Sequence, residues 1–234
     1  MQEVKDELAK AKITVPVTIA DYADTWAANP SMVEAVDIVS ANQYPYWEKK
    51  NANESAAWFY KRMEPVIASA IKYKKKILIS ETGWATGGFA AKAGPSTPAQ
   101  AAKYLNDFSL LAKQMDWNYY YFTSFDMAFN SNETDTDNVE QHFGLFYANG
   151  TMKPCYANLT VTGTSTVVTK APSQLATVTP APKASSANKT DNATATIKPT
   201  TTTVPGATPK SAAMGAALTS LVSMAVASVV MLAL

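Results

Sequence analysis

The stretch Lys76–Gly88, which reads KILISETGWATGG, decides the fold of this chain. Its aliphatic run Ile77–Ile79 is too short for a helix and too apolar for an exposed loop, so it predicts a buried parallel strand. Glu81 follows where that strand ends, and the carboxyl ends of strands carry the reacting groups in α/β barrels. Trp84 offers a flat apolar face of the kind on which sugar rings stack. The stretch therefore predicts a functional carboxylate at a strand end, unless Glu81 only caps the next helix or pairs with a lysine.

Apolar runs alternate with helical segments along the first two thirds of the chain, which predicts a parallel sheet. The expected strands are 15–20, 36–40, 77–79 and 117–124, and the first of them is followed by an expected loop that contains Asp21, Tyr22, Asp24 and Trp26. Helical spacing marks residues 55–75. Thr97-Pro98-Ala99-Gln100 supplies an N-cap, a first-turn proline and a glutamine that can reach back to the cap, so a further helix is expected to start there. Polar and aromatic residues follow the strands, so the carboxyl edge of the sheet is the expected active face.

The aromatic residues define a boundary. Every Trp, Tyr and Phe lies at or before Tyr156, so residues 1–158 are expected to form the folded part. Residues 159–211 are rich in Thr, Ser, Pro and Ala, and such a segment buries too little apolar surface to offset the entropy of ordering it. This composition is typical of an O-glycosylated stalk or a flexible linker. With a net charge of +1, the chain has no field that would attract nucleic acid.

Asn-x-Ser/Thr sequons are more frequent than chance predicts, which favours a secreted glycoprotein. They begin at Asn53, Asn132, Asn149, Asn158, Asn188 and Asn192.

Residues 212–234 form an uncharged run of apolar and small residues that is long enough to span a bilayer. No Lys or Arg follows it, so the positive flank of a retained transmembrane helix is missing. The pattern favours a glycosylphosphatidylinositol signal, with attachment near Gly206 or, alternatively, within 211–213. We expect a protein at the cell surface, anchored to the membrane through its C-terminus.

The N-terminus carries no matching export signal. Residues 1–12 place Val4, Leu8 and Ala11 on one helical face, which predicts a surface helix of a globular domain. Because the C-terminus resembles an anchor signal and the N-terminus has no signal peptide, we expect the chain to be incomplete. Cys155 is the single cysteine, so it is either a free buried thiol or has its partner in a missing part.

Four motifs occur in a fixed order within residues 1–158. They are Asn42–Tyr46, Ser80–Trp84, Phe122–Asp126 and Val139–Phe146. In this order and spacing they resemble glycoside hydrolase family 17, the β-1,3-glucanases of plants and fungi, in its cell-wall branch. The resemblance implies an α/β fold, the (β/α)8 TIM barrel, of which this chain supplies only strands five to eight. It also implies hydrolysis or transglycosylation of cell-wall β-1,3-glucan with retention.

Retaining hydrolysis needs a nucleophilic carboxylate and a carboxylic acid about 5–5.5 Å apart. By resemblance, Glu81 is the nucleophile. The family's general acid lies at the end of strand four, and Glu3 and Glu7 lie on the helix after that strand and cannot replace it. The chain alone is therefore expected to be inactive. The substrate contacts implied by the resemblance, with Trp47 as a further stacking candidate, are Tyr44, Tyr46, Trp84, Asp126 and Glu140.

Two positions depart from the family pattern. Cell-wall members carry an acidic residue and Pro-Trp-Lys directly after the position of Asp126, where this chain has residues 127–130, Met-Ala-Phe-Asn. Family members commonly have a proline directly after the motif tryptophan, and this chain has Ala85 at that position. These changes remove a polar contact and a basic side chain from the subsite formed by the strand-eight loop.

No cofactor or metal is predicted, because His142 is the only histidine and no Gly-rich phosphate loop is present. Three functions compete: a glucanase or transglycosylase, a non-catalytic glucan-binding or wall-structural protein, and an anchored adhesin-like stalk protein. Glu81 with Trp84 argues against the third. The expected partners are β-glucan and, through the anchor, the membrane.

Overall fold

The computed structural model describes residues 1–127 and 138–175. The expected tail at 212–234, the anchor residue Gly206 and the stalk beyond residue 175 lie outside the described residues. Within the two described ranges, none of the helices combines the length and apolarity that a membrane span requires.

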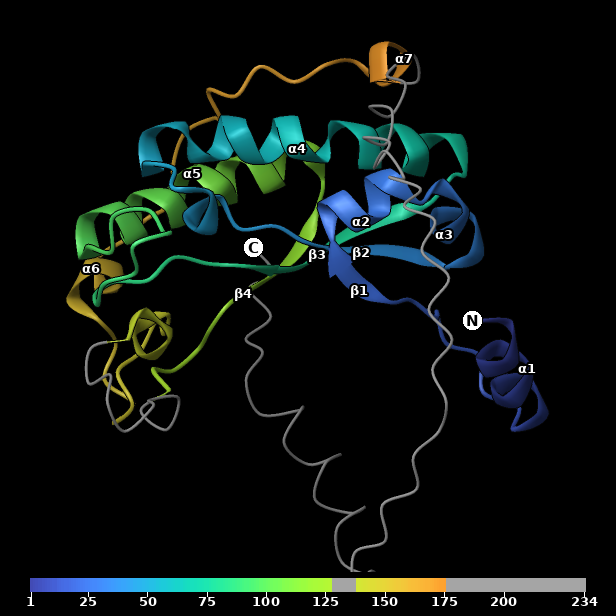
Figure 1. The fold of residues 1–234 in the computed structure, drawn as a ribbon, viewed down its shortest axis with the longest axis horizontal. Helices are drawn as coiled ribbons and strands as arrows, with labels where there is room; N and C mark the ends of the chain where they lie inside the picture. The colour runs from blue at the N-terminus through green and yellow to red at the C-terminus, as the bar shows by residue number, and fades with distance from the viewer. Residues whose placement is uncertain (128–137, 176–234) are drawn as a thin grey trace, which may run out of the picture. The chain divides into compact units, whose positions relative to one another are not determined.

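The centre of the fold is a parallel sheet with strand order β1-β2-β3-β4 (Figure 1). The strands are β1 (Ala20–Tyr22), β2 (Ile38–Asn42), β3 (Lys76–Thr82) and β4 (Asn118–Tyr121). Successive strands are neighbours because a helical connection returns the chain to the same edge each time. The predicted α/β fold is confirmed, as half of the eight strands of a barrel.

Helices cover one face of this sheet, where α4 and α5 lie side by side (Figure 1). The α-helices of the described chain are α1 (Gln2–Lys10), α2 (Ala23–Ala28), α3 (Pro30–Ala35), α4 (Ala52–Lys72), α5 (Pro98–Met115), α6 (Pro154–Ala157) and α7 (Pro172–Leu175). Two 3-10 turns are η1 (Pro45–Glu48) and η2 (Val139–His142).

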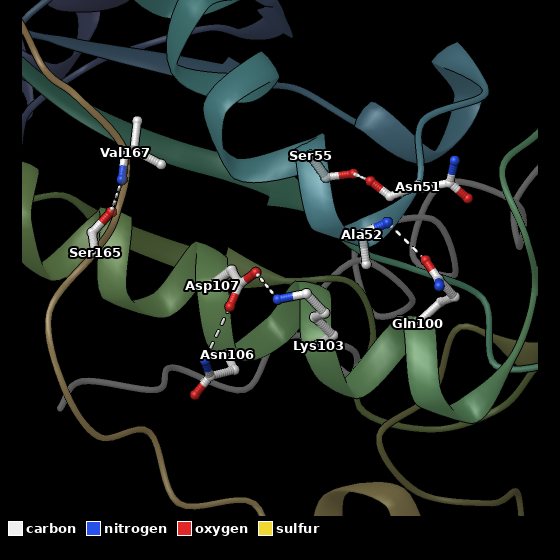
Figure 2. A network of polar contacts seen from close by, with 9 residues as sticks. All are labelled: Asn51, Ala52, Ser55, Gln100, Lys103, Asn106, Asp107, Ser165 and Val167. Atoms are coloured by element: carbon white, nitrogen blue, oxygen red, sulfur yellow. Dashed lines mark hydrogen bonds and ion pairs between the residues drawn. The ribbon is translucent and has the colours of Figure 1, made fainter.

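One side chain, that of Gln100, joins the first turns of α4 and α5 (Figure 2). The predicted cap of α5 is confirmed, because Thr97 Oγ1 accepts from Gln100 N at 3.3 Å. Gln100 does not reach back to its own cap. Its Oε1 accepts from Ala52 N at 2.7 Å, which satisfies a donor in the first turn of α4.

The core lies between the sheet and these two helices. The ring centroids of Phe59 on α4 and Phe108 on α5 are 5.0 Å apart, and Phe108 lies 5.0 Å from Tyr119 on β4. All three rings are buried, and each contributes about 1.5–3 kcal/mol to folding. We call this side of the sheet, which carries Ile79 and Tyr119, the helix face.

The opposite side carries Ile38, Leu78 and Tyr120, which are only half-buried, and we call it the open face. A cavity of about 570 Å³ extends over the amino edge of the sheet beside these three residues. Parallel sheets are normally covered on both faces. The open face therefore corresponds to the side that faces the interior of a barrel.

Two expectations for the N-terminal part need correction. The strand expected at 15–20 begins later, as β1, because Pro16 has no N–H and Val17 N donates to the Asp37 carboxylate at 2.8 Å. The loop expected after it folds into α2 and α3. Burial of Trp26, whose Nε1 donates to Ser40 O at 2.9 Å, holds α2 against β2.

The predicted surface helix is present as α1, and none of its residues is buried. Val4 is 50% exposed, so its apolar face is not covered by the described chain. An ion pair of 2.6 Å joins Lys5 on α1 to Asp37. The hydrogen bonds from Lys5 and from Val17 N lower the pKa of Asp37.

The packed part of the chain continues beyond the expected end at residue 158. Tyr60 on α4 accepts from Lys170 N at 2.6 Å, and Lys170 Nζ pairs with Glu64 at 2.8 Å. Leu175 is almost fully buried. The segment lacks aromatic residues, but it lies along α4 and α5, where their side chains supply the apolar surface that it needs.

Candidate functional site

The carboxyl edge of the sheet is built around an irregular rung of β3. Ala41 pairs with Ile79, but Asn42 pairs with Glu81, so Ser80 is an extra residue in β3. Ser80 Oγ donates to Asn42 Oδ1 at 2.6 Å. Such bulges redirect the side chains that follow them.

This bulge decides where Glu81 points. In a regular strand, Glu81 would share the helix face with Ile79, because side chains alternate. After the extra residue, Thr82 takes the helix face instead, and its Oγ1 lies 2.5 Å from the Tyr104 hydroxyl on α5. Glu81 is thereby directed to the open face, beside Asn42.

Tyr44 holds the Glu81 carboxylate. Its hydroxyl donates to Glu81 Oε2 at 3.2 Å. Burial, and then the negative charge of Glu81, raise the pKa of Tyr44 far above its ordinary value, so the hydroxyl stays protonated and donates. The main chain adds a second link, since Gln43 N donates to Glu81 O at 3.0 Å.

The turn after Glu81 requires glycine. A Cβ on Gly83 would lie 2.1 Å from Phe122 O, so no larger residue fits between the ends of β3 and β4. Phe122 N donates to Thr82 O at 2.7 Å, and this hydrogen bond links the ends of β3 and β4. The backbone that carries Glu81 is therefore tightly packed.

The expected sugar-binding role of Trp84 does not fit its position. Its ring has no exposed surface, and its Nε1 donates to Pro95 O at 2.8 Å. Tyr46 is equally buried, with its hydroxyl 2.6 Å from Ser96 Oγ. The two rings pack with centroids 5.3 Å apart. The two rings that the sequence offered as sugar contacts are therefore packed inside the protein, beneath the carboxyl edge of the sheet.

Asp126 and Lys153 form a buried ion pair of 2.7 Å. Lys153 is 3% exposed, and its Nζ also donates to Thr86 Oγ1 at 2.7 Å and to His142 O at 3.0 Å. Burial lowers the pKa of Lys153, and Asp126 acts in the opposite direction. Asp126 Oδ1 also accepts from Gly144 N at 2.9 Å. These contacts make Asp126 an anchor between loops of the carboxyl edge.

Glu140 lies on η2, beside Tyr46, and burial raises its pKa. The turn is fixed by Asn138, whose side chain accepts from Glu140 N at 3.0 Å. A half-buried carboxylate at this edge is available for hydrogen bonding to a ligand.

A family model for the BtgE/BtgC glycoside hydrolase domain matches residues 1–144. The chain belongs to this family. The site around Glu81 is thus the carboxyl edge of a BtgE/BtgC domain.

Curated relatives of this BtgE/BtgC domain include the "Probable glucan endo-1,3-beta-glucosidase btgC" of Aspergillus fumigatus. It is 31% identical over 66% of this chain and 24% of its own length. The "Glucan 1,3-beta-glucosidase BGL2" of Candida albicans is 27% identical over 64% of this chain and 51% of its own length. The chain thus spans between a quarter and a half of these relatives.

Comparison with solved structures leads to the same kind of enzyme domain. The glycoside hydrolase family 17 beta-1,3-glucanosyltransferase from Rhizomucor miehei has a TM-score of 0.57 at 26% identity, over 68% of this chain and 55% of that chain. An active-site mutant of that enzyme in complex with laminaritriose has a TM-score of 0.57 at 25% identity. The resemblance to family 17 drawn from the four motifs is confirmed.

Three features of this BtgE/BtgC domain were not predicted from its sequence. The bulge at Ser80 has no local signal. Lys153 was missed because its partner Asp126 lies 27 residues earlier. Tyr22 was read only as part of a loop, although it ends β1 and pairs in register with Asn42.

The remaining predicted positions are peripheral to this edge. Asn53, Asn149 and Asn158 are exposed. The sequons at Asn132, Asn188 and Asn192 lie outside the described residues. Cys155 is a free, half-buried thiol whose pKa is raised by burial. In residues 1–127 and 138–175, no cluster of three or more His, Cys, Asp or Glu is placed to hold a metal ion.

Proposed function

We propose that this chain carries the nucleophile of a retaining enzyme that acts on β-1,3-glucan. The observation that carries the proposal is the placement of Glu81. A strand bulge directs it to the open face, and Tyr44 holds Oε2 at 3.2 Å. A carboxylate that is fixed and accessible at a barrel edge suits attack on an anomeric carbon.

The proposed reaction has two halves. Glu81 attacks the anomeric carbon and forms a glycosyl ester while a general acid protonates the departing sugar oxygen. Water or another sugar hydroxyl then attacks the ester, and the same acid, now a base, removes its proton. Tyr44 orients the carboxylate and stabilises its charge before attack.

The substrate is proposed from relatives. Those named above are described as glucan endo-1,3-beta-glucosidase, glucan 1,3-beta-glucosidase and beta-1,3-glucanosyltransferase. A solved complex with laminaritriose supports a linear β-1,3-linked oligosaccharide as ligand. Hydrolysis and transfer use the same glycosyl ester, so both remain within the proposal.

A non-catalytic glucan-binding protein is the second candidate, and one observation favours it. Glu3 and Glu7 lie on exposed α1, and Glu7 pairs with Lys10 at 2.7 Å, so neither supplies the general acid. Binding without turnover of natural glucan is the expected behaviour of the chain by itself.

β-Laminaribiosyl fluoride separates these two candidates, because fluoride leaves without protonation. With Glu81 as the nucleophile, the chain should release about one equivalent of fluoride and then slow, since neither Glu3 nor Glu7 is placed to activate water. Glu81→Gln should abolish this burst, and Glu34→Gln, at an exposed position on α3, is the matched control. A chain that binds laminaritriose but releases no fluoride is a binding protein.

The location is also a proposal. Fungal relatives and exposed asparagines in three sequons support a glycosylated protein of the cell wall or cell surface. Residues 212–234 would anchor it through a glycolipid attached near Gly206. A reporter carrying residues 160–234 should then be released from cells by phosphatidylinositol-specific phospholipase, whereas a retained helix would resist release.

A further inference from the structure

The segment between α6 and α7 lies across the outer side of the two long helices, away from the sheet (Figure 1). We call residues 159–171 the strap. A small cavity of about 90 Å³ is lined by Ala56 and Ala57 of α4, by Leu110 of α5 and by strap residues 164–167. The strap therefore runs over the groove between α4 and α5.

Hydrogen bonds from both helices hold the second half of the strap. Gln114 on α5 donates from Nε2 to Thr169 Oγ1 at 3.1 Å. On α4, the Tyr60 hydroxyl accepts from Lys170 N at 2.6 Å. The side chain of Val167 packs against the core between these contacts. This part of the chain thus has a fixed orientation on the helices.

Exposure alternates along the strap. The side chains of Ser165, Val167 and Thr169 are half-buried against the helices, whereas their neighbours at positions 164, 166 and 168 are exposed. An extended chain places successive side chains on opposite sides. One side of the strap therefore faces the helices and the other faces solvent.

The hydroxyl groups of the two sides differ in their surroundings. On the inward side, Ser165 Oγ accepts from Val167 N at 3.1 Å (Figure 2), and Thr169 Oγ1 accepts from Gln114. The exposed side carries a row of threonines at every second position: Thr160, Thr162, Thr164 and Thr166. Accessible threonines on an extended backbone suit the attachment of O-linked sugars.

We propose that the exposed threonines of the strap are O-glycosylation sites of the folded domain: Thr160, Thr162, Thr164 and Thr166. Ser165 and Thr169 are excluded, because they face the helices. In the reaction, a threonine Oγ1 attacks the anomeric carbon of a sugar phosphate donor. The bond from that carbon to the phosphate oxygen breaks, and the hydroxyl proton passes to a base of the transferase.

This proposal goes beyond the chemistry proposed for Glu81 and rests only on the proposed location outside the cell. The composition of the segment favours sugars anywhere along it. The structure instead selects alternate positions on the domain itself. It also directs the sugars away from the sheet, so that they leave its carboxyl edge free.

A matched pair of variants separates the effect of orientation from that of composition. Val167 and Val168 are neighbours in the sequence, but Val168 is 89% exposed and Val167 is half-buried. Threonine has nearly the shape of valine, so both substitutions should preserve the fold. Val168→Thr should gain a sugar at the new hydroxyl. Val167→Thr should gain about tenfold less or none, because only the undocked fraction of the strap presents that position.

Site-resolved mass spectrometry of the full 234-residue chain, exported from a fungal host behind a removable signal peptide, gives the occupancies. The wild-type chain should carry sugars on the exposed row and none on Ser165 or Thr169. Gln114→Ala combined with Tyr60→Phe removes two contacts of the strap and should open Thr169 to modification. The same two changes away from the strap, Gln2→Ala with Tyr22→Phe, are the matched control and should leave the pattern unchanged.

Equal occupancy of the new threonines at 167 and 168 would overturn the assignment. Sugars on Ser165 and Thr169 as often as on their exposed neighbours, or sugars confined to residues beyond 175, would also overturn it. A chain exported without any sugar would overturn both this assignment and the proposed glycosylated location. The proposed role of Glu81 is tested separately by the fluoride burst.

Discussion

The Tyr44 hydroxyl donates to Glu81 Oε2 across 3.2 Å, from the loop that follows β2 to the end of β3. Tyr44 is itself fixed by edge-on contacts with Phe122 and Phe143, at centroid distances of 6.4 and 6.3 Å. The carboxylate is thus oriented by a donor that cannot rotate away. This pair fixes the position of the carboxylate at the carboxyl edge of the sheet.

Removing the donor tests its role. Tyr44→Phe keeps the ring contacts and should slow the fluoride burst by about tenfold to a hundredfold, since a hydrogen bond to a charged group is worth about 1.5–3 kcal/mol. The urea midpoint should change little. An unchanged burst rate would mean that Tyr44 only fills space.

The bulge at Ser80 makes a topological prediction. Deletion of Ser80 restores a regular ladder in which Glu81 follows Ile79 directly, so Glu81 stays on the open face opposite Asn42. Laminaritriose binding and the fluoride burst should therefore both survive the deletion. Ser80→Ala, which keeps the extra residue, should also retain the fold and the burst. Loss of the burst in a folded deletion variant would refute this account of how Glu81 is aimed.

The Lys153–Asp126 pair should dominate the stability of the loops at the carboxyl edge. Lys153→Met leaves Asp126 charged and unpaired, and should lower the free energy of unfolding by about 3–5 kcal/mol. Lys170→Met removes an ion pair to Glu64 in which the lysine is 45% exposed, so it should cost at most about 1 kcal/mol. Urea melts of the two variants give the comparison, and equal losses would contradict the buried role.

Glu140 predicts a pH dependence. Burial raises the pKa of Glu140 in the folded chain above its ordinary value, so the unfolded chain loses this proton first. Glu140 therefore favours folding when protonated, and this contribution is lost as pH rises through its folded pKa. Glu140→Gln should melt at a higher temperature than the wild type at pH 7. The difference should shrink toward pH 4, and an opposite trend would contradict the assigned pKa direction.

The sequence predicted the features that depend on neighbouring residues. The aliphatic run 77–79 marked β3 and placed Glu81 at its end, and the Thr97 cap marked the start of α5. Alternation of strands and helices gave the parallel order. The first two of these signals are each contained in a short stretch of neighbouring residues.

Features that depend on distant contacts were not predicted. Burial of Trp84 depends on Tyr46 and Tyr104, which come from other elements. The packing of residues 160–175 depends on Tyr60 and Glu64 of α4. The composition of that segment alone indicated a linker, because composition gives no information about the surface of α4 on which the segment packs.

The central claim is that Glu81 is the nucleophile, and covalent trapping tests it most directly. The chain is incubated with 2-deoxy-2-fluoro-β-laminaribiosyl fluoride, whose fluoride leaves without a general acid, and is then digested for mass spectrometry. We predict one added sugar on the peptide that contains Glu81, with no addition to Glu81→Gln. A label on a different carboxylate, or no label on a folded chain that binds laminaritriose, would contradict the account.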